Sequence, residues 1–169
     1  MKLVQDEPEV LVAPPLRRRL GCLTYETILS IGIAMGVSMV FTSVSGNPKD
    51  QDIFLLRIIL VLAIVLYFIF TWHRSGQTLA MKTWGIKIVS SNSKLPGIRR
   101  TMIRYIASWL WTSPVFIYYY LIGISSRFEL IVSSLVGILL YAALSFLFLD
   151  KQYIHDKISG TRLIDVRNI

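Results

Sequence analysis

Residues 17–44, RRRLGCLTYETILSIGIAMGVSMVFTSV, place three arginines before a long apolar stretch that contains one carboxyl group, Glu26. From residue 20 to residue 44 the stretch can cross about 30 Å of hydrocarbon at about 1.5 Å per helical residue. A carboxylate inside hydrocarbon is costly unless it is paired or protonated. The stretch therefore predicts a membrane-spanning helix with a functional or structural site at Glu26.

Three more apolar stretches are long enough to span, at residues 53–72, 103–124 and 128–149. The chain is 54% hydrophobic and only 17% charged over 169 residues, which is too apolar for a water-soluble globule. We predict an all-α membrane protein built as a four-helix transmembrane bundle, with the lipid bilayer as its surroundings. Arg57 and Arg104 lie near the starts of their stretches, where we expect them to snorkel outward.

The basic residues predict the orientation. Fifteen of the 18 Lys and Arg residues fall before the first stretch, between the second and third, or after the fourth, if Arg104 at the start of the third stretch is counted with the loop before it. Because cytoplasmic loops carry an excess of Lys and Arg, both termini are predicted to be cytoplasmic. Basic cytoplasmic segments also account for the net charge of +8, so this charge does not predict nucleic-acid binding.

The domain boundaries follow from these stretches. Residues 1–16 hold three acidic residues and a Pro-Pro pair instead of a signal peptide, and we expect a flexible cytoplasmic tail there. Residues 17–166 form the predicted transmembrane domain, and residues 167–169 its C-terminal end.

The loop between the second and third stretches is amphipathic. From residue 77 to residue 84 its apolar residues, Leu79 among them, share a face, which predicts a short helix at the membrane surface, ended by Gly85. Residues 86–89 alternate like a strand, and residues 161–166 look similar. We predict that these two segments pair as a small β-sheet.

Several motifs together carry a resemblance: Arg18-Arg19-Leu20 before the buried acid, Gly76-Gln77-Thr78-Leu79 in the loop, Gly85-Ile86-Lys87-Ile88-Val89, and His155-Asp156-Lys157-Ile158-Ser159-Gly160-Thr161 near the end. Over residues 17–166 the chain resembles the RDD family of bacterial membrane proteins. The resemblance implies a multi-pass protein of the bacterial inner membrane, in a family suspected of transport that includes antiporter-like members.

The family takes its name from an arginine and two aspartates. By position these correspond to Arg19, Glu26 and Asp156, so a glutamate replaces the first aspartate. The secondary candidates that accompany this network are Arg18, Gln77, Asp150 and His155.

Spacing supports part of this network. Arg19 and Glu26 lie within about 20° of one helix face and about 10 Å apart along the axis. For Asp156 we expect a basic partner such as Arg18 or Arg19. If Arg19 bridges both acids, the three side chains form a network at the inner mouth of the bundle. A buried acid can equally hold helices together without any transport.

Two functions stay open at this point. One is transport of a small ion or solute, of the cation/proton exchange type. The other is a non-transporting accessory or assembly subunit whose basic loop binds another protein or anionic lipid headgroups. Four helices rarely enclose a substrate cavity, so a transporter of this size is predicted to be a homo-oligomer or a subunit of a larger membrane complex.

Catalysis and metal binding are not expected. Two histidines and one cysteine are too few for a convincing zinc site. The sequence has no nucleophile elbow and no phosphate-binding loop, so we predict neither enzymatic activity nor a cofactor.

Overall fold

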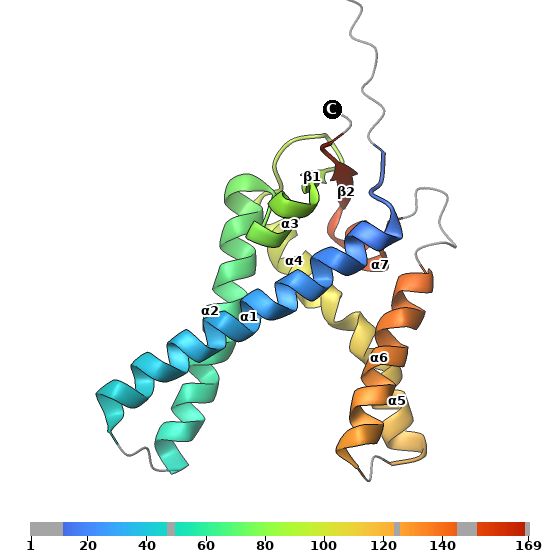
Figure 1. The fold of residues 1–169 in the computed structure, drawn as a ribbon. Helices are drawn as coiled ribbons and strands as arrows, with labels where there is room; N and C mark the ends of the chain where they lie inside the picture. Colours follow the sequence, from blue (N-terminus) through green and yellow to red (C-terminus); the bar gives the residue numbers. More distant parts are fainter. Residues whose placement is uncertain (1–11, 47–49, 124–125, 145–151, 168–169) are drawn as a thin grey trace, which may run out of the picture.

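The computed structural model describes residues 12–46, 50–123, 126–144 and 152–167, and Figure 1 gives its fold. The elements in chain order are α1 (Leu16–Ser45), α2 (Asp50–Ser75), α3 (Leu79–Trp84), β1 (Ile86–Ser90), α4 (Ile98–Ser108), the 3-10 helix η1 (Trp109–Thr112), α5 (Ser113–Leu121), α6 (Arg127–Leu144), α7 (Ile154–Ser159) and β2 (Thr161–Asp165).

Two helical hairpins diverge from one end of the molecule (Figure 1). The first hairpin is α1 with α2, and the second is α5 with α6. Where the hairpins meet, the first turns of α1, the end of α2, the start of α4, the short helices α3 and α7, and both strands gather. We call this end the junction. The chain is therefore mostly helical, with one small sheet at the junction.

Three described helices are long and apolar enough to cross a membrane: α1, residues Asp52–Ser75 of α2, and α6. The predicted count of four spanning helices is not confirmed. The stretch predicted at residues 103–124 is divided among α4, η1 and α5, and α4 begins earlier, at Ile98. Pro114 stands in the first turn of α5, where its missing N–H costs least. The predicted fourth span corresponds to α6, and residues 145–149 lie outside the described part.

The buried core lies at the junction. Its buried members come from α1, α2, α3 and the two strands: Cys22, Trp72, Ala80, Met81, Ile86, Ile88 and Leu163. Beyond the junction the helices expose most of their apolar side chains, as membrane helices do toward lipid. The polar and apolar contacts that define the fold are therefore concentrated at one end.

A close approach of α1 and α3 fixes this core. A Cβ atom added at Gly21 would lie only 2.5 Å from the Trp84 ring, so only glycine fits there without movement. Trp84 ends α3, and Gly85 follows it with a left-handed φ of 63°, as the predicted helix stop requires. The predicted apolar face of this helix is corrected, since Leu79 is exposed whereas Ala80 and Met81 are buried.

The predicted sheet is confirmed. β1 and β2 pair in an antiparallel register that sets Ile86 opposite Asp165 and Ser90 opposite Thr161. Before α1, the carbonyl of Val12 accepts a hydrogen bond of 2.9 Å from the backbone N–H of Asp165. The chain is therefore attached to β2 from Val12 onward, and residues 1–11 of the predicted tail lie outside the described residues.

Candidate functional site

Glu26 lies in the third turn of α1 and is buried where α1, α2 and the start of α3 meet. Its Oε1 accepts a hydrogen bond from the Thr78 hydroxyl, which is itself fully buried. Its Oε2 accepts a long hydrogen bond of 3.5 Å from the Tyr67 hydroxyl of α2. Glu26 is thus held by hydroxyl groups from two other parts of the chain.

Thr78 has a second role at the same atom. It is the N-cap of α3, and its Oγ1 accepts a hydrogen bond of 3.1 Å from the backbone N–H of Met81. The hydroxyl oxygen accepts from α3 while its hydrogen points to Glu26, so the carboxylate orients the cap. Sequence reasoning quoted Thr78 only within a motif, although a threonine directly before a short helix is a recognisable N-cap signal.

The second buried carboxylate, Asp156, lies in the first turn of α7 and is fully buried. Its Oδ1 forms an ion pair with the guanidinium of Arg104, which is 4% exposed. Its Oδ2 accepts a hydrogen bond of 3.1 Å from the backbone N–H of Tyr153 and so caps α7. Arg104 Nη1 also donates to Thr161 Oγ1 at 2.9 Å. This pair therefore joins α4, α7 and the start of β2.

The burial of Arg104 corrects the expectation that it snorkels outward. Because α4 begins at Ile98, Arg104 lies in its second turn, on the face that packs against α7. Its guanidinium carbon also lies 5.3 Å from the centre of the Trp72 ring. The partner that the structure gives Asp156 is thus Arg104, which sequence reasoning had not considered for this role.

The predicted arginines hold other groups. Arg19 is buried, its Nε donates to the carbonyl of Pro14 at 2.8 Å, and its guanidinium lies 5.0 Å from the centre of the Tyr153 ring. Arg18 forms an ion pair with Asp165 of β2 and donates to the carbonyl of Trp84 at 3.3 Å. Both arginines therefore attach the first turn of α1 to the junction.

Two glutamines brace the sheet. Gln77 Nε2 donates to the carbonyl of Ile86 at 2.8 Å, so this secondary candidate positions β1. Gln152, which sequence reasoning missed, accepts from the N–H of Leu163 at 2.8 Å and donates to its carbonyl at 3.0 Å. Asp150, another predicted candidate, lies outside the described residues.

His155 lies next to the Asp156 ion pair. The Tyr141 hydroxyl accepts a hydrogen bond from the backbone N–H of His155 at 3.2 Å and lies 2.7 Å from its Nδ1. The Tyr141 hydroxyl and the imidazole Nδ1 therefore share a hydrogen bond, while the imidazole Nε2 lies 3.7 Å from Asp156 Oδ1. Burial lowers the pKa of His155 well below 6.5, and the charges of Arg104 and Arg19 act in the same direction. His155 is accordingly neutral at pH 7.

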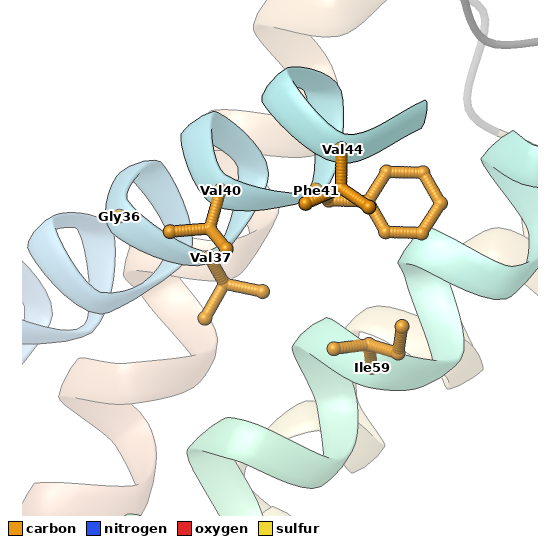
Figure 2. Close-up of a pocket in the computed structure, with 6 residues that line it drawn as sticks. All are labelled: Gly36, Val37, Val40, Phe41, Val44 and Ile59. Carbon is orange, nitrogen blue, oxygen red and sulfur yellow. The ribbon is translucent and has the colours of Figure 1, made fainter. Parts of the chain in front are cut away.

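No ordinary metal site is present in the described ranges, where no three His, Cys, Asp or Glu side chains gather. An apolar hollow of about 430 Å³ lies between α1 and α2, as Figure 2 shows. Its lining residues are Gly36, Val37, Val40, Phe41, Val44 and Ile59. Gly36 is ten residues beyond Glu26, which is about 15 Å along a helix, so the hollow is separate from the carboxylate.

Comparison with known proteins identifies the family. The model of the RDD family matches residues 13–160, which is most of the chain. No curated protein and no solved structure matches it. The match agrees with the motifs at both buried carboxylates and with helices apolar enough to cross a membrane. The chain therefore belongs to the RDD family.

Proposed function

We propose that this protein exchanges a small cation for protons across the bacterial inner membrane, with Glu26 as the group that binds either ion. The observation that carries the proposal is a buried carboxylate on an apolar helix, within hydrogen-bonding range of the hydroxyls of Thr78 and Tyr67. Carboxylate and hydroxyl oxygens are the ligands that hard cations prefer. An intramembrane carboxylate can also be neutralised by a proton, so the two ions compete for one position.

Asp156 has a different role in this proposal. It faces a buried guanidinium and a backbone N–H, so a cation would have to displace Arg104 before it could bind. Removing one member of a buried ion pair costs about 3–5 kcal/mol. We therefore assign Asp156 and Arg104 to holding the junction together, and exchange to Glu26 alone.

The assembly and its orientation complete the proposal. The basic residues that surround the junction in the sequence favour the cytoplasmic side for the junction and for both termini. The diverging hairpins favour a homo-oligomer or a subunit of a larger complex, in which neighbouring chains complete an ion path beside Glu26.

A proton-flux assay in proteoliposomes tests the exchange. We expect wild-type protein to give proton flux that depends on an added cation such as Na⁺, and Glu26→Gln to abolish it. Glu129→Gln is the matched control, since Glu129 is a half-buried carboxylate in the first turn of α6, in the other helical hairpin. Flux from Glu26→Gln at the wild-type level would refute the assignment, provided both variants melt as folded proteins.

The accessory role stays a second candidate because of one observation. Through Thr78, Glu26 also fixes the N-terminus of α3, a role that needs no transport. This alternative predicts no cation-dependent flux from wild-type protein and a partner that co-purifies through the basic cytoplasmic side. Under this alternative, Glu26→Gln lowers the stability of the protein, and neither the variant nor the wild type gives cation-dependent proton flux.

A further inference from the structure

Helix α4 has its two faces reversed relative to a helix of a water-soluble protein. The buried face carries Thr101, Arg104 and Ala107 at intervals of three residues. The opposite face carries apolar side chains that are largely exposed and recur every three or four residues into η1. They are Ile98 (53% exposed), Met102 (48%), Ile106 (70%) and Trp109 (53%). We call these four residues the α4 stripe.

An exposed apolar stripe of this kind needs an apolar environment. A surface helix in water turns its apolar stripe toward the core, whereas α4 turns Thr101 and Arg104 inward and leaves its apolar stripe exposed. About 25 cal/mol is lost for each Å² of apolar surface left in water, so the stripe favours contact with an apolar phase. Yet α4 is not among the described helices that are long and apolar enough to span.

Positively charged residues just before α4 and in its first turn indicate that this apolar phase is the membrane. Lys94 and Arg99 are exposed, and each stands beside an exposed apolar residue, Leu95 and Ile98 respectively. Cations next to apolar side chains, followed by a purely apolar stripe, are typical of helices that enter a membrane interface. Basic side chains at this level attract anionic lipid.

We propose that the α4 stripe is immersed in the membrane leaflet nearest the junction, with Lys94 and Arg99 against the phosphates of anionic phospholipids. From Ile98 to Ile106 the helix rises about 12 Å, close to the thickness of half the hydrocarbon core. This surface is independent of whether Glu26 exchanges ions.

Immersion changes the setting of the buried ion pair. Arg104 lies on the other face of the same helix, so its pair with Asp156 is held near hydrocarbon depth with protein on one side and lipid beyond the stripe. Water is then excluded from both faces, which strengthens the attraction between the two charges.

Site-directed spin labelling tests the immersion. Nitroxides are attached in turn at Ile98→Cys, Met102→Cys and Ile106→Cys, and at Asn92→Cys as the control, because Asn92 is exposed in the turn after β1. Cys22 is buried and is replaced by alanine, and the same labels on the native background check that replacement. The protein is reconstituted in vesicles of phosphatidylcholine and phosphatidylglycerol.

Collision with oxygen, which concentrates in hydrocarbon, is compared with collision with a water-soluble nickel chelate. We expect the ratio of oxygen collision to nickel collision to rise steadily from Ile98 to Ile106. At the control position Asn92 we expect nickel collision to exceed oxygen collision. High nickel collision at Ile106 would place the stripe in water and overturn the proposal. Low collision with both reagents would also overturn it, because a protein surface, such as a second copy of this chain, would then cover the stripe.

A lipid-selectivity measurement tests the headgroup contact. We expect spin-labelled phosphatidylglycerol to be immobilised by the protein more than spin-labelled phosphatidylcholine, and the double variant Lys94→Gln, Arg99→Gln to lose most of this preference. The matched control is Arg162→Gln, which removes an exposed cation on β2. An unchanged preference in the double variant would refute the contact with anionic lipid.

Discussion

The hydroxyl of Thr78 donates its hydrogen to the carboxylate of Glu26 and accepts the backbone N–H of Met81 with the same oxygen. One side chain therefore connects the carboxylate in α1 to the first turn of α3. A change in the charge of Glu26 affects α3 directly, because it alters the hydrogen bond that the Thr78 hydroxyl donates to the carboxyl group, and the same hydroxyl caps α3. The position of α3, and of β1 behind it, is thus coupled to this carboxyl group.

Removing the Thr78 hydroxyl tests that connection. Thr78→Val has nearly the same shape but loses both hydrogen bonds, and we expect it to lower the free energy of unfolding by about 1–3 kcal/mol. Thr78→Ser keeps the hydroxyl and is the control, with stability close to wild type. Thermal unfolding in detergent measures both, and equal melting temperatures for the two variants would contradict the proposed link.

The Arg104 and Asp156 pair predicts a strong coupling. We expect Arg104→Gln or Asp156→Asn alone to destabilise the protein by about 3–5 kcal/mol, because each leaves a buried charge without its partner. The double variant should cost less than the sum of the two, and a double-mutant cycle on unfolding free energies measures the difference.

An exposed arginine of the same helix is the control for that cycle. Arg99→Gln should change stability by less than about 0.5 kcal/mol, as expected for an exposed surface position. If the single variants at the pair were as mild as Arg99→Gln, the pair would not hold the junction together.

His155 predicts a loss of stability in acid. Because its pKa in the folded protein lies below the ordinary value, the unfolded chain binds a proton first as the pH falls below about 6.5. Stability due to this group is therefore complete above that pH and decreases below it, by at most about 1.4 kcal/mol per pH unit.

Unfolding measured between about pH 7.5 and about pH 5 checks this effect. We expect the stability of His155→Gln to depend less on pH than that of wild type over this range. Identical slopes would show that burial and the neighbouring arginines do not lower the pKa of His155 in the folded protein.

Gly21 predicts a steric effect that opposes helix propensity. Alanine normally stabilises the middle of a helix by about 1 kcal/mol relative to glycine. Gly21→Ala should nevertheless destabilise the protein by about 1–3 kcal/mol, because the new Cβ meets the Trp84 ring. Gly32→Ala, where the new Cβ meets nothing within 4 Å, is the control and should be neutral or stabilising. Thermal unfolding of the two variants measures the difference. Equal changes in melting temperature for Gly21→Ala and Gly32→Ala would argue against the close approach of α1 and α3.

Local patterns predicted much of this fold. Long apolar stretches indicated α1, α2 and α6, and the left-handed glycines Gly85 and Gly160 end short helices directly before the two paired strands. These signals are local, since chain length, alternation and a residue that tolerates positive φ are all visible in a short window. The resemblance to the RDD family also came from such short motifs.

The partners at the site could not be predicted in the same way. Arg104 and Asp156 are 52 positions apart, and their contact depends on how α4 packs against α7. The early start of α4 turned an arginine expected at a helix end into a buried one. Thr78 is also 52 positions from Glu26, so its cap role was readable from sequence but its contact with the carboxylate was not.

The pairing of β1 with β2 imposes an order on biogenesis. β1 leaves the ribosome before α4, α5 and α6, and its partner strand follows all of them. Until β2 emerges, β1 has an open edge that can attract other chains. Both hairpins can therefore enter the lipid before the sheet forms. A chain that ends before Thr161 would be inserted with β1 unpaired, and such a chain would be a target for proteolytic quality control.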